Sequence, residues 1–508
     1  MLGTFTYGYD GVTRRLASVT YPNGQTSTYA YLDNAGDHRL QTIHHKYPDG
    51  STLSQFDYTY DAVGNIQTWR QQADTAAVLW TYGYDSADQL TAAMKASDPG
   101  GAVLQRYAYA YDPAGNRTSE QIDDVVTKAT YDSLNRLVSQ DAGGPLVFKG
   151  QLDEPSAVTI DGRPATVAAD HTFQGTAEVA AGTTTVTIDA VDPSGNAATA
   201  VYEVDQAAAG KAFTYDANGN LTSDGARTFE WDARNQLVAI NVGTHRSEFT
   251  YDGWERRVRV VEKEGGTIQT ADDILWDYHD EMVERRDGSG TTGRFFAFAL
   301  QDHGAGRFLT RDHLLSVTDA VVGSDVDGRY SYDPFGRVTV VAGDHADSFG
   351  YTGALAHWWS TLQFLKLRGY DADLGRWLSQ DPIGLKAGPN MYSYVGNNPI
   401  NWLDPMGTQA APSWPNGNVL PGSNKQDGLC SFPEKYTASN MDANPCMLQC
   451  CQQHDDCYKK YGCNQSSWAS PSKAYSCVVC DKILLPCLAA AAGKQPWDCR
   501  PKCEARSW

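Results

Sequence analysis

The sequence predicts a mainly β protein that ends in a small, disulfide-rich α-helical domain. One observation is an aromatic–Asp hairpin repeat that recurs from the N-terminus to residue 407, and the other is that all 11 cysteines fall between Cys430 and Cys503. A chain of 508 residues, 41% of them hydrophobic, is long enough to bury cores in two to four domains. The formal net charge of -20 argues against a nucleic-acid partner.

Charge and cysteines divide the chain at about residue 408. Residues 408–508 hold 10 Lys plus Arg and 8 Asp plus Glu, so the acidity belongs to the preceding part. Cysteines at this density indicate disulfides formed in an oxidising compartment, although no signal peptide opens the chain. The longest apolar run, 483–492, is short and contains Pro486 and Cys487, so we expect no transmembrane helix.

The repeat predicts a series of β-hairpins. It alternates aromatic residues with Thr or Val and continues into Asp-x-x-Gly-Asn or a similar turn, as in Tyr58-Thr59-Tyr60-Asp61 and Tyr109-Ala110-Tyr111-Asp112. Further copies end in Tyr84-Asp85, Tyr131-Asp132, Tyr215-Asp216, Trp231-Asp232, Tyr251-Asp252 and Tyr332-Asp333. A single hairpin cannot bury its apolar face, so we expect the copies to pair into one long, curling sheet. His44-His45 has no partner at metal spacing and is predicted to lie on a strand surface.

These repeats resemble the tyrosine-aspartate (YD) repeats of the Rhs family over 1–144 and 206–340. The resemblance implies a β-shell that encloses a C-terminal toxin, with the tyrosines serving in aromatic packing. Residues 145–205 lack the repeat and alternate short strands with turns, which resembles an immunoglobulin-like β-sandwich insert with a spacer or adhesive role.

Residues 341–407 form the junction before the cysteine-rich tail. The run from Leu374 to Leu385 and Tyr392-Ser393-Tyr394-Val395-Gly396-Asn397 resemble the Rhs core-associated region. Two Asp-Pro-x-Gly segments, starting at Asp381 and Asp404, are spaced as in that family's self-cleaving aspartyl protease. Paired carboxylates can serve as base and acid, so these two are the candidates for cleavage near Thr408. The family usually has an apolar residue at the position of Thr408. The alternative is that both segments are ordinary turns.

The tail contains two predicted helices. Asn444-Pro445 begins one that ends at Gly462 and places Cys450, His454 and Cys457 on one face. The second, 472–492, holds Cys477, Cys480, Asp481 and Cys487. If Cys450 bonds Cys487 and Cys457 bonds Cys480, Asp481 lies within a turn of His454, which could then act as a general base on water. Asp455 offers an oxygen ligand for calcium.

The run from Cys450 to Tyr458 resembles the active-site helix of secreted phospholipase A2, and Cys480-Asp481 resembles that family's second helix. The resemblance implies both disulfides and calcium-dependent hydrolysis of the sn-2 ester of membrane phospholipids. His454 would activate water, Asp481 would orient it, and Asp455 would bind calcium. Asp427-Gly428-Leu429-Cys430 is similar to the calcium segment of bacterial members, which makes Asp427 and the carbonyl of Leu429 further candidate ligands.

Together these features predict an Rhs toxin that is made in a bacterial cytoplasm and secreted, or injected by a type VI or similar machine, into a target periplasm or the extracellular space. The expected partners are a phospholipid membrane, an immunity protein, and a secretion spike or an N-terminal shell portion, since the chain begins within a repeat. One alternative is a cell-surface Rhs adhesin with an inactive disulfide-rich tail. The other is a zinc site built from Cys477, Cys480 and His454.

Overall fold

The structure is a computed structural model that describes residues 2–10, 15–206, 210–277, 281–302, 304–343, 349–408 and 410–412. Regular structure in these ranges is almost entirely β, which confirms the mainly β prediction for this part of the chain. Short 3-10 turns accompany the strands at η1 (Asn34–Gly36), η2 (Tyr351–Gly353), η3 (Trp358–Ser360), η4 (Gly384–Ala387) and η5 (Val395–Asn397). The cysteine-rich tail lies outside the described residues.

The first half of the repeat array forms a 13-stranded antiparallel sheet in which sequential strands are neighbours. Its strands are β1 (Thr6–Tyr9), β2 (Leu16–Thr20), β3 (Thr26–Tyr31), β4 (Leu40–Lys46), β5 (Thr52–Tyr60), β6 (Ile66–Ala73), β7 (Ala76–Tyr84), β8 (Leu90–Asp98), β9 (Val103–Tyr111), β10 (Arg117–Ile122), β11 (Val125–Tyr131), β12 (Leu137–Ala142) and β20 (Lys211–Ala212). Strands of six to nine residues suit hairpins that bury one face.

The second half forms a separate 14-stranded sheet, so the prediction of one continuous sheet was wrong. Its strands are β21 (Thr214–Tyr215), β22 (Leu221–Ser223), β23 (Arg227–Trp231), β24 (Leu237–Val242), β25 (His245–Tyr251), β26 (Arg257–Glu264), β27 (Thr267–Trp276), β28 (Met282–Asp287), β29 (Gly290–Phe296), β30 (Ala299–Asp302), β31 (Ala305–Arg311), β32 (Val317–Val322), β33 (Asp325–Tyr332) and β34 (Val338–Gly343). The two sheets separate where the chain returns from the insert. Phe213, between β20 and β21, still donates its amide to Val138 O of β12, whereas β21 pairs with β22.

The repeat motif builds each hairpin through two recurring hydrogen bonds. Asp61 Oδ1 accepts the backbone amides of Val63, Gly64 and Asn65, at 2.7 to 3.0 Å, and Gly64 takes a φ of +104°. The same aspartate contact recurs at Asp85, Asp112, Asp132, Asp216, Asp232, Asp252, Asp312 and Asp333. The tyrosine before the aspartate donates its hydroxyl to the hairpin before it, as Tyr60 does to Leu40 O at 2.6 Å. The motif therefore closes its own turn and ties consecutive hairpins together.

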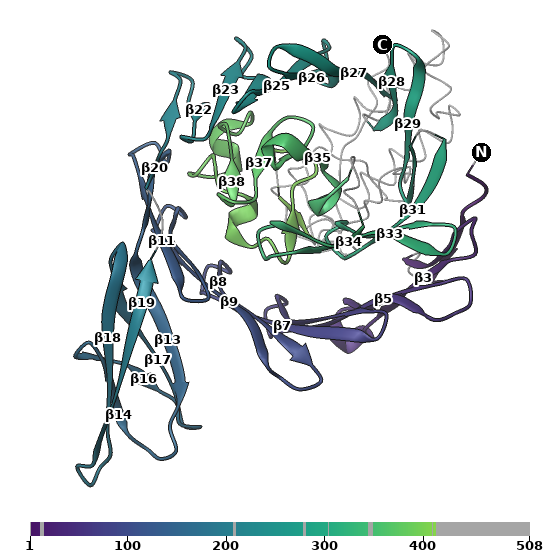
Figure 1. The fold of residues 1–508 in the computed structure, drawn as a ribbon. Coiled ribbons are helices and arrows are strands. Elements are labelled where there is room, and N and C mark those ends of the chain that lie inside the picture. The colour runs from purple at the N-terminus through teal and green to yellow at the C-terminus, as the bar shows by residue number, and fades with distance from the viewer. Residues whose placement is uncertain are drawn as a thin grey trace, which may run out of the picture. The chain divides into compact units, whose positions relative to one another are not determined.

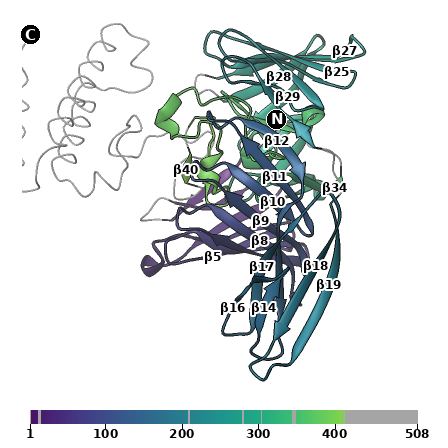
Figure 2. The same ribbon diagram turned by 90° about the vertical axis from the view of Figure 1, so that its left-hand side faces the viewer.

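The two sheets curve around a shared interior, and the last strands of the second sheet pack against the first strands of the first (Figures 1 and 2). Tyr21 donates its hydroxyl to Leu309 O at 3.1 Å. His45 bonds Arg311 O through Nε2 and Ser27 through Nδ1, and it is fully buried. The prediction that this histidine lies on a strand surface was therefore wrong: the strand turns it inward, where hydrogen bonds to both ring nitrogens stabilise it.

Between β12 and β20 the chain forms two small facing sheets that extend away from the array (Figure 1). One contains β13 (Gly144–Gln151), β16 (Thr166–Val167) and β17 (Thr172–Val179), and the other β14 (Ala157–Ile160), β15 (Arg163–Pro164), β18 (Gly182–Val191) and β19 (Ala197–Gln206). Their apolar residues form a separate core. Gln206 connects this insert to the array, because its side chain accepts from Val126 N and donates to Asp124 O.

Residues 349–412 form an inner segment that lies within the curve of the two sheets (Figure 1). Its strands are β35 (Leu355–His357), β36 (Leu362–Phe364), β37 (Gly369–Asp371), β38 (Arg376–Trp377), β39 (Trp402–Leu403) and β40 (Ala411–Pro412). Hydrogen bonds attach this segment to both sheets: Asn390 donates to Asn116 on one side, and Tyr392 donates to Gly219 O on the other. The junction is thus held from two sides.

Candidate active site

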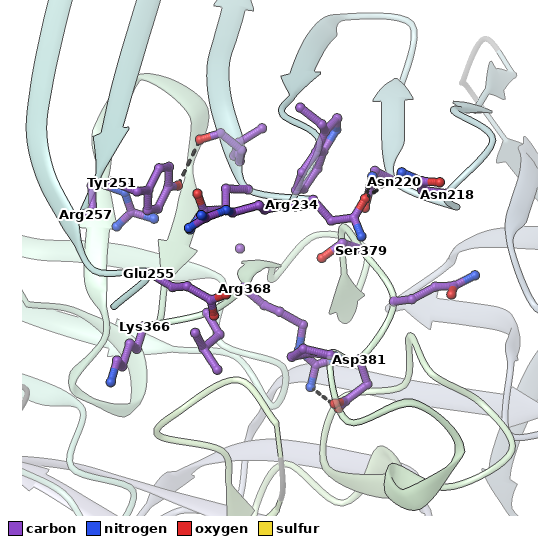
Figure 3. Close-up of a pocket in the computed structure, with 18 residues that line it drawn as sticks. Asn218, Asn220, Arg234, Tyr251, Glu255, Arg257, Lys366, Arg368, Ser379 and Asp381 are labelled. Atoms are coloured by element: carbon purple, nitrogen blue, oxygen red, sulfur yellow. Dashed lines mark hydrogen bonds and ion pairs between the residues drawn. The ribbon is translucent and has the colours of Figure 1, made fainter. Parts of the chain in front are cut away.

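The two Asp-Pro-x-Gly segments of the junction meet at one arginine. Arg368 lies in the loop between β36 and β37, and its guanidinium stacks 4.0 Å from the ring centre of Trp377. Arg368 Nη2 lies 2.6 Å from Asp381 Oδ2 and 3.2 Å from Asp404 Oδ2 (Figure 3 shows the first contact). All three side chains are 3–4% exposed. The chain therefore buries two carboxylates, 23 positions apart in sequence, on one cation.

Each aspartate also closes its own turn. Asp381 Oδ1 accepts the amide of Ile383 at 3.0 Å. Asp404 Oδ1 accepts the amides of Gly407 at 2.8 Å and Thr408 at 2.9 Å. The two interpretations of these segments are thus compatible, because one carboxylate oxygen stabilises the turn and the other faces Arg368.

The peptide between Gly407 and Thr408 is held on both sides by this cluster. Arg368 Nε donates to the carbonyl oxygen of Gly407, while Asp404 accepts the amide of Thr408. Gly407 has a φ of +74°, and a Cβ there would lie 3.1 Å from the backbone nitrogen of Arg368. A side chain at 407 would therefore be strained and would push the peptide away from the guanidinium.

Burial sets the electrostatics of the cluster. Desolvation raises the pKa of Asp381, while the charge of Arg368 opposes the shift. Desolvation likewise lowers the pKa of Arg368 to about 10, with Asp381 and Asp404 opposing. A carboxyl group whose neutral form is favoured beside a second carboxylate is the arrangement that lets one group donate a proton while the other accepts one.

Two cavities adjoin the cluster. One of about 570 Å³ is lined by Asp381, Asp404, Arg368 and Thr408. Another of about 240 Å³ lies against Arg368 and Asp381 and reaches hairpins of the second sheet (Figure 3). The first cavity thus borders Thr408, the residue that follows Gly407.

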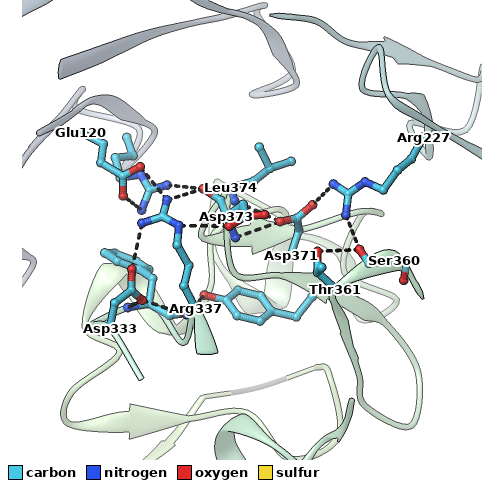
Figure 4. Close-up of polar contacts among 12 residues, drawn as sticks. Glu120, Arg227, Asp333, Arg337, Ser360, Thr361, Asp371, Asp373 and Leu374 are labelled. Atoms are coloured by element: carbon cyan, nitrogen blue, oxygen red, sulfur yellow. Dashed lines mark hydrogen bonds and ion pairs between the residues drawn. The ribbon is translucent and has the colours of Figure 1, made fainter. Parts of the chain in front are cut away.

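Buried ion pairs fix the inner segment around the cluster (Figure 4). Arg227 contacts both Asp224, at 2.6 Å, and Asp371. Arg337 contacts Glu120 at 2.6 Å, Asp333 at 2.8 Å and Asp373 at 3.1 Å. These contacts connect both sheets to Asp371 and Asp373 of the inner segment.

Sequence reasoning found Asp381 and Asp404 but missed Arg368. Nothing in its spacing connects this arginine to either aspartate; the available signal was a cation between apolar residues in Leu365-Lys366-Leu367-Arg368. The tail residues His454, Asp481, Asp455, Asp427, Leu429, Cys450, Cys457, Cys480 and Cys487 lie outside the described residues, and so their roles stay predictions. In the described ranges, no cluster of His, Cys, Asp or Glu is suited to a metal ion, and no helix has the length and hydropathy to cross a bilayer.

No protein-family profile matches the chain. Among curated proteins, it is 25% identical to the tRNA3(Ser)-specific nuclease WapA of Bacillus spizizenii, covering 79% of this chain and 16% of that protein. It is 26% identical to Double-stranded DNA deaminase toxin A of Burkholderia cenocepacia, covering 65% and 22%. It is 26% identical to Toxin subunit YenC1 of Yersinia entomophaga, covering 69% and 42%. Among solved structures, TcdB2-TccC3 aligns at 19% identity with a TM-score of 0.36, covering 79% and 22%.

The fold and the site define a β-hairpin repeat protein whose two large sheets curve around a junction segment. Two of the relatives above, those of Burkholderia cenocepacia and Yersinia entomophaga, are named as toxins. The chain spans less than half the length of each of these curated relatives.

Proposed function

We propose that the chain is an Rhs toxin whose shell part cleaves itself between Gly407 and Thr408 and so releases a phospholipase A2-like tail. The observation that supports cleavage is the position of one peptide against three buried groups: Arg368 on its carbonyl oxygen, Asp404 on its amide, and Asp381 on the same guanidinium. Polarised carbonyl and paired carboxylates are what hydrolysis of an amide requires.

The proposed reaction uses these groups in sequence. Asp404, held by two amides and Arg368, takes a proton from water as the water oxygen bonds the Gly407 carbonyl carbon. Arg368 Nε stabilises the oxygen that becomes negative, and Asp381 in its neutral form can donate to that oxygen. The C–N bond then breaks as Asp404 passes its proton to the Thr408 nitrogen. The products are a carboxylate at Gly407 and an amine at Thr408.

Intact mass of the purified chain tests this step. We expect fragments of residues 1–407 and 408–508, and an uncleaved chain for Asp381→Asn and Asp404→Asn. Asp373→Asn is the matched control, because Asp373 also belongs to the inner segment and pairs with an arginine, Arg337 of the second sheet, but is half exposed and lies outside the cluster. A cleaved Asp404→Asn chain, or cleavage at another bond, would contradict the assignment.

For the tail we propose calcium-dependent hydrolysis of the sn-2 ester of phospholipids, on the strength of its sequence pattern. His454 and Asp481 would activate water, and Asp455, Asp427 and the Leu429 carbonyl would hold calcium, which polarises an ester carbonyl when bound. The relatives whose names give an activity on tRNA or DNA are much longer proteins. The pattern of His454-Asp455 between Cys450 and Cys457 in this chain's tail is the reason for proposing a lipid substrate instead.

Fatty-acid release from mixed phospholipid vesicles by the oxidised full chain tests the tail. We expect release that needs calcium and is lost in His454→Gln and Asp455→Asn. Asp456→Asn, one residue along the same predicted helix, is the matched control and should retain release. Absence of release under oxidising conditions with calcium would contradict the phospholipase proposal and favour an inactive binding tail.

In the same proposal, the toxin acts in a target periplasm or outside the cell, where its disulfides can form. A producer would then need an immunity protein, and a secretion spike or a further shell portion would carry the toxin out. Co-purification with such components from a producing strain would test this part.

A further inference from the structure

Arg257 occupies a position that most other repeats give to an apolar side chain. It is the fifth residue after the repeat aspartate, Asp252, and begins β26. The equivalent residues of other repeats are Ile66, Leu90, Leu137, Leu221, Leu237, Met282, Val317 and Val338. Arg257 is 6% exposed, so a cation stands where the hairpin normally buries a hydrocarbon side chain.

A second repeat makes the same exchange and shows how it is compensated. Arg117, the fifth residue after Asp112, lies 3.2 Å from Glu120 and also donates to Asp373 O at 3.2 Å. Its charge is therefore neutralised within the protein, as burial of an arginine requires.

Arg257 has no such partner in the described part of the chain. No carboxylate there lies within ion-pair distance, and its buried Nε has no hydrogen-bond acceptor. It is held by rings instead: its guanidinium carbon lies 4.0 Å from the ring centre of Phe364, 5.3 Å from that of Phe249 and 5.6 Å from that of Tyr251. Aromatic faces orient a guanidinium without neutralising it.

The same side chain lines the cavity of about 240 Å³ (Figure 3). Arg234, Lys366 and Arg368 add positive charge to the lining, against the carboxylates of Glu255 and Asp381. Gln236, which also lines the cavity, has a buried Nε2 without an acceptor in the described residues. Two buried donors at this place, Arg257 Nε and Gln236 Nε2, thus have no acceptor in the described residues.

We propose that this cavity is a binding site for a small oxyanion, a phosphate or a carboxylate, with Arg257 as its principal ligand. The planar guanidinium can donate two parallel hydrogen bonds to such a group. A neutral ligand would leave the buried charge uncompensated. Two sources can supply the anion: free phosphate or carboxylate in solution, or the carboxylate that self-cleavage would create at Gly407. The second source rests on the proposed function, whereas the first does not.

Thermal unfolding of the full chain tests the site, with sodium phosphate, sodium acetate and sodium chloride compared at equal ionic strength. We expect phosphate or acetate to raise the unfolding temperature relative to chloride. Arg257→Leu restores the usual residue of the repeat, so it should fold and should unfold at a higher temperature than wild type in chloride. Its unfolding temperature should not rise further in phosphate or acetate. Arg259→Leu on the same strand, whose arginine is 46% exposed and paired with Asp273, is the matched control and should keep the wild-type response.

The uncleaved Asp404→Asn chain separates the two sources. Equal anion responses in wild type and Asp404→Asn support free anion as the occupant, and they do so even if the chain does not cleave itself. A response in Asp404→Asn that is lost in cleaved wild type supports the new Gly407 carboxylate. The proposal is overturned if neither chain responds, or if Arg257→Leu responds as wild type does.

Discussion

Replacing Arg368 by Gln should abolish self-cleavage while the shell still folds. The substitution removes the donor to the Gly407 carbonyl oxygen and the cation between Asp381 and Asp404, but it keeps a polar side chain. The prediction isolates what the arginine does in the reaction from what it does for stability.

The structure sets the size of both effects. Loss of one hydrogen-bond donor to a developing oxyanion lowers hydrolysis by about 10²–10³. Removal of one partner from a buried ion pair costs about 3–5 kcal/mol of the free energy of unfolding, and the two carboxylates here are only 3–4% exposed. Protonation of Asp381, whose pKa burial already raises, should reduce that cost.

Arg227→Gln is the matched control for stability. Arg227 is 11% exposed and also pairs with two buried aspartates, Asp224 and Asp371, yet it lies outside the cleavage cluster. We expect it to lose a comparable free energy of unfolding and to keep the wild-type cleavage rate. The rate is measured by gel densitometry of freshly made chain, at a temperature where circular dichroism shows both variants folded.

Two results would refute this reasoning. The first is a folded Arg368→Gln chain that cleaves at the wild-type rate, because the guanidinium would then have no part in the reaction. The second is a folded Arg227→Gln chain that fails to cleave, because loss of cleavage would then reflect any disturbance of the inner segment.

Three further predictions concern the shell and the peptide. Burial raises the pKa of Asp312 from 3.8 to about 7, so the folded state holds this proton at a pH where the unfolded chain has lost it. The free energy of unfolding should therefore fall by roughly 4 kcal/mol as pH rises from about 4 to 7. In Asp312→Asn, a pH series of denaturant unfolding should lack this fall. Tyr60→Phe should lower the free energy of unfolding in urea by about 1 kcal/mol, because it removes the hydrogen bond to Leu40 O. Tyr58→Phe should leave that free energy unchanged or raise it, because the buried Tyr58 hydroxyl has no partner in the described residues. Equal losses of stability in the two variants would contradict the role given to the tyrosine that precedes the repeat aspartate. Gly407→Ala should slow cleavage by displacing the peptide from the cluster, and an unchanged rate would mean that this peptide is not the one cut.

The sequence by itself determined the local structure of the shell. Each Asp-x-x-Gly-Asn turn closes within five residues, as the bonds from Asp61 to the next turn amides show. Alternating aromatic and polar residues then assign one strand face to the interior, because side chains point to opposite faces with a period of two. Short-range chemistry of this kind is readable without a structure. The two Asp-Pro-x-Gly turns were readable for the same reason, whereas the pairing of Asp381 with Asp404 was predicted from the resemblance to the Rhs self-cleavage motif.

The tertiary structure decided what lies opposite each strand. The break of the array at Phe213 and the burial of His45 against Arg311 depend on how far the sheets curve, which no repeat unit encodes alone. Arg368 and Arg257 carry the same charge and both line one cavity, yet one meets two carboxylates and the other meets three aromatic rings. Those neighbours come from segments distant in sequence, and their electrostatic effect follows from burial, so only the folded chain assigns the two arginines their different roles.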